Sequence, residues 1–409
     1  MSRWQLTLRR ILRQNWVHSA LYCLAGIVVA LLAAEFQWLV PEGFALRVGA
    51  DAAGNILGVL ASSMLSVTTF SLTILVSALA SASSGVSPRA TRLLVQDRTT
   101  QNALATFIGA FMFSIVGIIA LASGLYGAGG RLLLLGATVA VIAIIIVTLL
   151  RWMQHLSRMG RVGETVERVE AAALAAFEDR RHAPFLGGAP RLPGTHQPVP
   201  LYPTAIGYVQ HVDVSRLARV AGARVIDVAA MPGRFVHPAC PLAWMPDGIG
   251  AEEQDRLRDA FLIGPERTFE QDPRFGLIVL GEIADKALSA AVNDSGTVIG
   301  VLGSMTRVLA AWARPLEQTP ETEHPQIRIP ALDATDLLDD AFGPVARHGA
   351  GLLEVGIRLQ KTLAALAALA PATFGEAAAA QAALALKRAE QALDLPEDRA
   401  RLRAAAEEA

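Results

Sequence analysis

The sequence predicts an α-helical integral membrane protein with four transmembrane helices, followed by a cytosolic region of mixed α/β and helical structure. Hydrophobic residues make up 53% of the 409 residues, and the mean hydropathy of +0.40 is too high for an ordinary soluble protein. Four apolar segments in the first third of the chain are each about long enough to cross a bilayer, which takes roughly 20 residues. Everything after Arg151 is too polar to cross.

The predicted transmembrane domain covers residues 1–152, with helices at about 17–40, 55–82, 103–126 and 132–151. Trp16 and Trp38 stand at the edges of the first helix, as interface anchors do. Arginines gather before the first helix, after the second and after the fourth, whereas each intervening loop holds one. By the positive-inside rule, both termini are therefore expected in the cytoplasm of a bacterium, with the helices in its inner membrane.

The second apolar segment is unusual because it is both long and polar. Asp51 and Arg89 enclose about thirty-seven uncharged residues, many of them Ser or Thr. On a helix with ~100° per residue, seven polar side chains lie within an arc of roughly 80°: Asn55, Ser62, Ser66, Thr69, Thr73, Ser77 and Ser84. We call this arc the polar stripe. Asp51 joins it if the helix begins early enough, and Met64, Val67, Ile74, Leu75 and Ala78 occupy the far side, where lipid or neighbouring helices are expected.

Three interpretations of the polar stripe remain open. In the first, the small hydroxyl residues let helices pack closely and hydrogen-bond to each other. In the second they line a water-filled pore between copies of the helix, and in the third they line a transporter cavity. The stripe persists for about six turns, longer than a packing patch needs, which favours a pore. A transporter is disfavoured because no carboxylate lies deep within any span and the four helices show no inverted repeats. The pore hypothesis requires a homo-oligomer, since four helices alone cannot enclose the stripe.

The ends of the stripe predict charge selectivity. Asp51 falls at the outer end on the face of the stripe, where a ring of carboxylates would concentrate cations. Arg89 lies roughly 180° from the centre of the stripe and is not expected to face the conduction path. The sequence therefore predicts a cation-conducting pore, whose permeant species are small inorganic ions.

The third and fourth segments are apolar and look like lipid-facing supports for the second. Gly109, Gly117 and Gly124 allow close approach of the third helix to another. A short turn at Gly127-Ala128-Gly129-Gly130 predicts an antiparallel hairpin of the two.

The remaining chain divides by composition. We predict a connecting amphipathic helix at 153–182, a Pro-rich linker at 183–203, a small α/β module at 204–246 and a mainly helical region at 247–409. In that last region, helices are expected at 251–263, 275–292 and 297–312, with a brief strand at 327–329 and a helix capped by Asp333.

Catalytic and cofactor motifs are missing from the sequence, which predicts that the protein is not an enzyme and needs no cofactor. His237 and Cys240 are three residues apart but lack a second ligand pair nearby, so a packing role is expected and no metal site. Cys23 and Cys240 are the only two cysteines, which leaves no disulfide framework. The net charge of −1 gives no reason to expect a nucleic-acid partner.

Two sets of motifs resemble the bacterial membrane-protein family called domain of unknown function 2254. The first runs through Phe70-Ser71-Leu72 and Ser83-Ser84-Gly85-Val86-Ser87-Pro88-Arg89. The second comprises Gln271-Asp272-Pro273-Arg274-Phe275-Gly276-Leu277, Ala287-Leu288-Ser289 and Val292-Asn293-Asp294. The resemblance implies four membrane helices and a cytosolic region, without established catalytic residues. Ser289-Ala290-Ala291 departs from the family pattern, which has a proline there.

The two sets of motifs suggest how a cytosolic region would act on a pore. We expect the end of the stripe helix, at Gly85, Pro88 and Arg89, to contact the segment from Gln271 to Asp294 or a neighbouring subunit. The predicted gating and coupling residues are Gly85, Pro88, Arg89, Gln271, Asp272, Asn293 and Asp294. The competing hypothesis is a non-conducting membrane sensor or scaffold whose stripe is a packing seam and whose cytosolic domain binds a partner.

Overall fold

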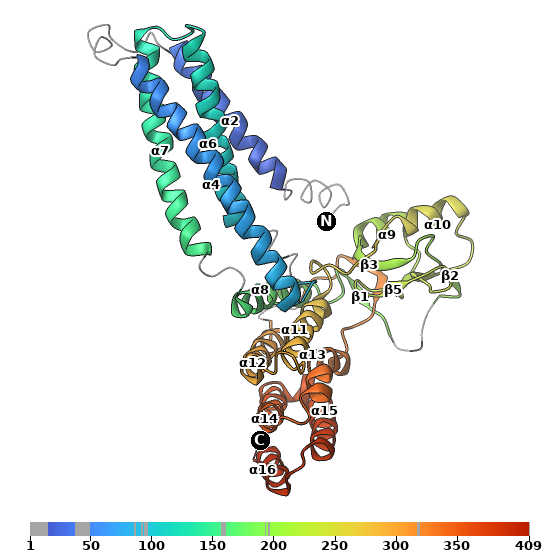
Figure 1. Ribbon diagram of the computed structural model, residues 1–409. Helices are drawn as coiled ribbons and strands as arrows, with labels where there is room; N and C mark the ends of the chain where they lie inside the picture. Colours follow the sequence, from blue (N-terminus) through green and yellow to red (C-terminus); the bar gives the residue numbers. More distant parts are fainter. Residues whose placement is uncertain are drawn as a thin grey trace. The chain divides into compact units, whose positions relative to one another are not determined.

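The structure, a computed structural model, describes residues 15–36, 50–85, 87–90, 93, 97–156, 161–192, 194, 197–316 and 320–408. It divides into two compact units (Figure 1). The helix-bundle unit comprises Leu6–Ser84 and Thr91–Arg161. The carboxy-terminal unit comprises Val162–Ala409 together with the short segment Gly85–Ala90.

Within its described residues, the helix-bundle unit is built from helices that run side by side (Figure 1): α2 (Asn15–Glu35), α4 (Ala50–Gly85), α6 (Arg98–Ala122) and α7 (Ala128–Leu156). Among the described residues, α4, α6 and α7 contain stretches long and apolar enough to cross a membrane, and α2 contributes the shorter apolar stretch Ala20–Glu35. α4 has 36 residues. At 1.5 Å per residue it is ~54 Å long, well beyond a hydrocarbon layer of about 30 Å.

Glycines set the closest helix contact of the bundle. A Cβ added to Gly26 of α2 would lie 2.7 Å from the carbonyl oxygen of Gly109, and one added to Gly109 would lie 2.9 Å from the carbonyl oxygen of Tyr22. The backbones of α2 and α6 therefore touch, as small residues permit in membrane helices. The third and fourth spans were predicted to be alike as lipid-facing supports, but of the three candidate spans α6 is the most enclosed by the rest of the structure and α7 the least.

The carboxy-terminal unit contains an α/β module with two sheets. The described strands are β1 (Gly188–Pro190), β2 (Val199–Leu201), β3 (Gly207–Val212), β4 (Ile226–Val228), β5 (Phe235–Val236), β6 (Ala243–Met245), β7 (Phe261–Gly264) and β8 (His324–Ile329). One sheet has the order β1-β8-β4-β6-β2 and the other β5-β3-β7. β4 pairs in parallel with β8, through Ile226 and Ile327, and antiparallel with β6, through Asp227 and Trp244. Helices α9 (Val214–Ala221) and α10 (Ala251–Arg258) complete the module.

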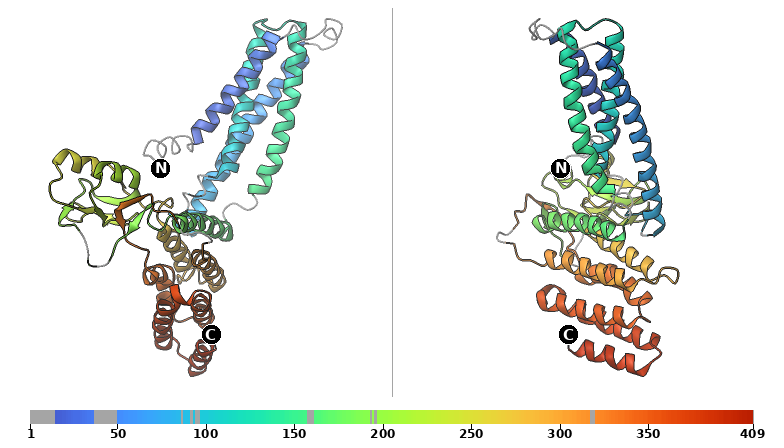
Figure 2. Two further views of the ribbon diagram at one scale, coloured as in Figure 1. Left: turned by 180° about the vertical axis from the view of Figure 1, so that it is seen from behind. Right: turned by 60° about the vertical axis from the view of Figure 1, so that its left-hand side comes forward.

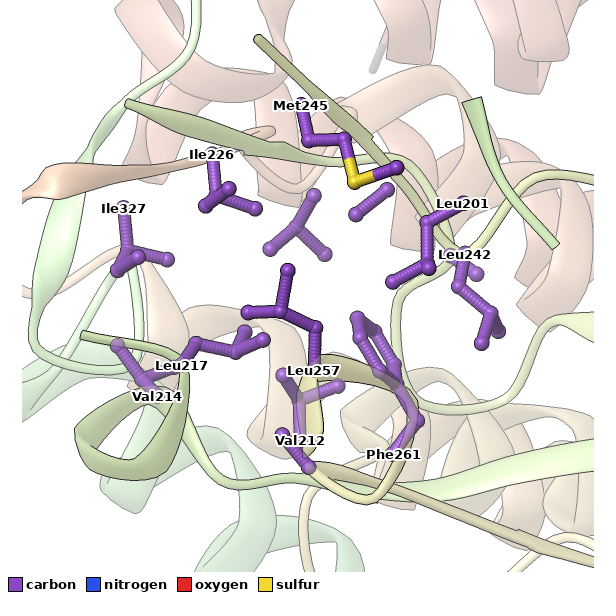
Figure 3. Close-up of a cluster of buried hydrophobic side chains, with 14 of the residues drawn as sticks. Leu201, Val212, Val214, Leu217, Ile226, Leu242, Met245, Leu257, Phe261 and Ile327 are labelled. Carbon is purple, nitrogen blue, oxygen red and sulfur yellow. The ribbon is translucent and has the colours of Figure 1, made fainter. Parts of the chain in front are cut away.

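An apolar core fills the space between the sheets and these helices (Figure 3). Ile226, Met245 and Ile327 of the larger sheet point toward Leu217 of α9 and Leu257 of α10 (Figure 3). All five side chains are buried. Burial alternates along β3 from Gly207 to His211, because the period of two places successive strand residues on opposite faces.

The predicted Pro-rich linker at 183–203 is wrong. β1 and β2 lie in this segment and form the two edges of the five-stranded sheet described here. Pro190 and Pro200 belong to these strands, since an edge strand tolerates a residue that lacks a backbone N–H. The module therefore extends beyond the predicted 204–246, and it also recruits β7 and β8.

Packed helices make up the rest of the carboxy-terminal unit (Figure 2). They are α8 (Val162–His182), α11 (Pro273–Ala287), α12 (Ser295–Trp312), α13 (Ala334–His348), α14 (Leu353–Leu369), α15 (Pro371–Ala392) and α16 (Pro396–Glu407). α11 packs against α8, α12 and α13, and most of its residues are buried. α14, α15 and α16 pack on one another and, through α12 and α13, on the rest.

Candidate pore-lining face and coupling segment

The polar stripe of α4 faces away from the other helices of its own bundle. Its described side chains, Asn55, Ser62, Ser66, Thr69, Thr73 and Ser77, are all exposed. The opposite face of α4 is buried, at Ala53, Leu57, Leu60, Met64 and Ser71. α4 begins at Ala50, so Asp51 lies within the helix and on the arc of the stripe. The side chains of Asp51 and Ser84 lie outside the described part of the chain.

The hydroxyl groups of the stripe donate hydrogen bonds to their own helix. Ser66 donates to the carbonyl oxygen of Ser62 at 3.0 Å, and Thr73 to that of Thr69 at 3.0 Å. Ser62 and Thr69 bond to carbonyl oxygens of the preceding turn in the same way. These four hydroxyl protons thus have acceptors without a second helix, which leaves the lone pairs of the four oxygens available for other partners.

One buried hydrogen bond fixes the rotation of α4. The indole Nε1 of Trp152, on α7, donates to the hydroxyl oxygen of Ser71 at 3.0 Å. Ser71 is the serine of α4 that turns inward, and Trp152 is buried beside it. Because Ser71 lies about 160° around the helix from Thr69 and Thr73, this bond holds the stripe on the outside. No local sequence pattern pairs these two residues, since they are 81 positions apart.

Polar groups also connect the ends of α6 and α7. Asp97 caps α6 by accepting from the backbone N–H and the hydroxyl of Thr100. The same carboxylate lies 2.7 Å from Nε2 of His155, near the end of α7. The imidazole of His155 in turn packs against Trp152, with ring centroids 5.7 Å apart. The network therefore continues the contact that begins at Ser71.

The segment that follows α4 is anchored within the carboxy-terminal unit. Ser87 is buried, and its hydroxyl donates to the carboxylate of Glu282 on α11 at 2.9 Å. The guanidinium of Arg89 forms an ion pair with the same carboxylate. The backbone N–H of Ala90 bonds to the carbonyl oxygen of Ser87 at 3.1 Å, which closes a turn. The expected contact between this segment and residues 271–294 is present, and the carboxylate of Glu282 makes it.

Gln271 and Asp272 have other partners, which join the α/β module to the helices. The side-chain amide oxygen of Gln271 accepts from the backbone N–H of Val212 at 2.9 Å. The backbone carbonyl oxygen of Gln271 accepts from the guanidinium of Arg180 on α8 at 3.2 Å. Asp272 is 1% exposed and accepts two hydrogen bonds from Arg267, at 2.7 and 2.9 Å.

Burial dominates the electrostatics of this cluster. It raises the pKa of Asp272 above its ordinary value, against the opposing effect of the hydrogen bonds from Arg267. It also lowers the pKa of Arg180 to about 10, and the nearby charge of Asp272 partly restores it. The cluster is a buried ionic joint inside the carboxy-terminal unit, built from residues of α8, the module and the start of α11.

Asn293 and Asp294 form the corner between α11 and α12. Asn293 has a φ of 48°, in the left-handed region that asparagine tolerates. Asp294 caps α12 by accepting from the backbone N–H of Thr297 at 3.0 Å and from its hydroxyl at 2.6 Å. These bonds lower the pKa of Asp294. Both residues thus have a local structural role.

A cleft of about 530 Å³ lies between α9 and α10, lined by Arg216, Arg219, Glu253 and Arg256. Arg216 pairs with Asp259, and Arg256 pairs with Glu252, so carboxylates offset much of the positive charge of the cleft. His237 and Cys240 lie in one turn, where the backbone N–H of Cys240 bonds to the carbonyl oxygen of His237. Among the described residues, no group of three or more His, Cys, Asp or Glu side chains is placed to hold a metal ion.

Sequence comparison places the chain in a family. The sequence profile of the family described as "Predicted membrane protein (DUF2254)" matches residues 13–365, nearly the whole chain. The chain belongs to the DUF2254 family. Its membership agrees with the apolar helices of the bundle and confirms the resemblance recognised in the motifs.

Proteins with a similar sequence add no assigned activity. The chain is 37% identical over 128 residues to "Uncharacterized protein Rv1290c" of Mycobacterium tuberculosis and to "Uncharacterized protein Mb1321c" of Mycobacterium bovis. The match covers 29% of this chain and 25% of each relative, so the chain corresponds to a quarter of the length of these curated relatives. No solved structure matches the chain.

Proposed function

We propose that this DUF2254 protein is a homo-oligomeric ion channel in which copies of α4 surround a pore. The observation that carries the proposal is the orientation of α4: its apolar face packs inside the bundle, while its polar stripe has no covering helix among the described residues of the same chain. A polar face that runs through a membrane needs protein or water beside it, because unpaired polar groups are expensive in hydrocarbon. Other copies of the chain would supply that environment.

The proposed topology has four spans, with α2 as the first. Arginine placement orients both termini toward the cytoplasm, across the inner membrane of a bacterium. The carboxy-terminal unit is then cytosolic, where it assembles or gates the pore. The bilayer, further copies of the chain and small inorganic ions are its partners; nucleic acid is not, and the protein is not an enzyme.

Cations are the proposed permeant ions. The hydroxyl protons of Ser62, Ser66, Thr69 and Thr73 are donated back to the helix, so the stripe offers oxygen lone pairs to the pore. Oxygen dipoles and rings of carboxylates favour cations. Asp51, on the arc of the stripe near the outer end of α4, supplies such a ring in the proposed orientation.

Coupling to the carboxy-terminal unit would pass through the segment after α4. Gly85 ends α4. Ser87 and Arg89, which follow Gly85 by two and four residues, are both bonded to Glu282. A displacement of α11 would therefore pull directly on the stripe helix. In this proposal Gly85 serves as the hinge of that joint, because glycine has the freest backbone, and Pro88 restricts the backbone of Ser87 before it.

The alternative is a non-conducting membrane sensor or scaffold with a partner-binding cytosolic domain. One observation favours it: the stripe hydroxyls are bonded within their own helix, so they can also pack against a second copy without water. The two functions differ in whether the contact between copies is hydrated.

Ion flux and thiol accessibility separate the two functions. The purified chain, with Cys23 and Cys240 replaced by Ala, is reconstituted in vesicles under asymmetric salt, and a charged thiol reagent is applied to Ser66→Cys, Thr69→Cys and Thr73→Cys variants. A channel gives a cation-selective current that modification reduces at these three positions, whereas cysteine at Ala61, on the buried face, serves as the unreactive control. Asp51→Asn is expected to weaken the cation preference. Absence of current together with unreactive cysteines would support the scaffold and reject the channel.

A further inference from the structure

Val59 is a large apolar side chain on the line of the polar stripe. It precedes Ser77 by five full turns of 3.6 residues, so both point in the same direction. Its neighbours along the line are Asn55, one turn before it, and Ser62, one turn after it. Among the described large hydrophobic residues, Val59 has the highest exposure, 70%.

The packing of α4 does not account for this exposure. Leu57 and Leu60, on either side of Val59 in the sequence, are buried against the other helices of the bundle. Phe70 and Val76 are also exposed, but they flank the stripe about 60° from its centre. In a ring of α4 copies they would point toward the neighbouring copies, whereas Val59 lies inside the arc of the stripe, in line with Ser77 and about 40° from its centre.

We infer that Val59 forms a hydrophobic constriction in the pore, which rests on the proposed channel function. Copies of α4 around an axis would bring the Val59 side chains into one ring between a ring of Asn55 amides and a ring of Ser62 hydroxyls. A ring of branched methyl groups offers no hydrogen bond to water or to a hydrated ion, and such constrictions gate pores by dewetting. The rings on both sides stay wet, so the barrier is confined to about one helical turn.

Two substitutions at Val59 change the ring in opposite directions. Val59→Thr keeps the shape and replaces one methyl with a hydroxyl that can bond to the carbonyl oxygen of Asn55, as the stripe hydroxyls do to theirs. Val59→Phe enlarges the apolar ring. We expect ion flux to rise about tenfold in the first variant and to fall about tenfold in the second, because wetting of the constriction limits the flux.

The matched control is Val139→Thr, because Val139 is a similarly exposed valine, 61%, on α7 instead of α4. The full-length chains are reconstituted in vesicles loaded with a cation-sensitive dye, after size-exclusion chromatography has shown that all variants have the same oligomeric state. Ser66→Leu is included to report on the stripe itself. Val139→Thr is expected to match the wild type.

The outcomes separate the constriction from the channel. If Ser66→Leu reduces flux while both Val59 variants stay within about twofold of the wild type, the constriction is rejected and the channel is retained. Flux that appears in Val59→Thr and is absent from the wild type supports both the channel and the constriction, because the valine ring then closes the wild-type pore. If neither the wild type nor Val59→Thr exceeds protein-free vesicles, the channel is rejected and the constriction with it. An equal rise in Val139→Thr would also reject the constriction.

Discussion

Truncation of Glu282 to alanine tests how the segment after α4 is held. Ser87 is 2% exposed, and its hydroxyl donates to this carboxylate at 2.9 Å. A hydrogen bond to a charged group contributes ~1.5–3 kcal/mol. The truncation also leaves that buried hydroxyl without its acceptor, at ~1–3 kcal/mol. These two figures overlap, so we expect Glu282→Ala to weaken the turn at residues 87–90 by ~2–4 kcal/mol.

Arg89→Ala should have a much smaller effect, although Arg89 binds the same carboxylate. The side chain of Arg89 is 58% exposed, and exposed ion pairs contribute ~0–1 kcal/mol. Glu282→Gln keeps an acceptor for Ser87 and should recover most of the loss. Glu252→Ala, which removes an exposed ion pair with Arg256 on α10, is the control for a surface glutamate.

Hydrogen exchange at the backbone N–H of Ala90, which bonds to Ser87 at 3.1 Å, measures the opening of this turn. Since ~1.4 kcal/mol is a factor of ten, Glu282→Ala should speed exchange about 30- to 700-fold and Arg89→Ala less than about sixfold. Equal effects of Glu282→Ala and Arg89→Ala would refute the assignment of the anchor to Ser87. A Glu282→Gln variant as weak as Glu282→Ala would show that charge, not the hydrogen bond, holds the turn.

Three further substitutions test other parts of the structure. Asp272→Asn removes the carboxylate charge that offsets the burial of Arg180 and should lower the free energy of unfolding by ~3–5 kcal/mol in urea, followed by circular dichroism of the full chain. Gly109→Leu forces a side chain against the backbone of Tyr22; thermal unfolding in detergent should show a loss of ~1–3 kcal/mol. Asp294→Ala should cost about 1 kcal/mol at pH 7 by loss of the helix cap. Because hydrogen bonds lower the pKa of Asp294 in the folded chain, its contribution is present above its ordinary value of 3.8 and is lost as pH falls through the lowered value, so variant and wild type should converge at acid pH.

Helical periodicity predicted the polar stripe because the direction of a side chain on a helix depends only on its position along the helix. The same reasoning placed Met64 opposite the stripe, where it is buried. Which face the bundle would cover could not be predicted in this way. The hydrogen bond between Ser71 and Trp152 decides it, and a pair 81 residues apart leaves no local pattern.

The errors in the fold also arise from partners distant in sequence. The Pro-rich segment was expected to be a linker because proline disfavours helices and central strands, yet the edge of a sheet accepts it at Pro190 and Pro200. A single helix was expected over 251–263. The structure has α10 until Arg258 and then β7, since Phe261 and Ile263 pair with Val212 and Val209 of β3.

The motifs that identify the family also proved to have two kinds of role. Asn293 and Asp294 shape the turn between α11 and α12, and Gln271 and Asp272 join the module to the helices. Spacing alone does not distinguish such structural residues from coupling residues. Glu282 makes the contact with Ser87, and it lies within the apolar run of α11, where a single glutamate resembles an ordinary surface residue.

The attachments of α4 fit a helix that is held at few points. α2 and α6 meet backbone to backbone at Gly26 and Gly109, whereas α4 contacts the bundle through long side chains such as Leu57 and Leu60. A neutral hydrogen bond contributes ~0.5–1.5 kcal/mol. The bond between Ser71 and Trp152 therefore adds only a modest free energy against rotation of α4. In the proposed channel, a rotation of about 60° would carry Phe70 or Val76 to the position of the hydroxyls. Because α4 is held by few contacts, a displacement of Glu282 on α11 could rotate α4 in the proposed channel. The rotation would then replace the polar lining of the pore by an apolar one.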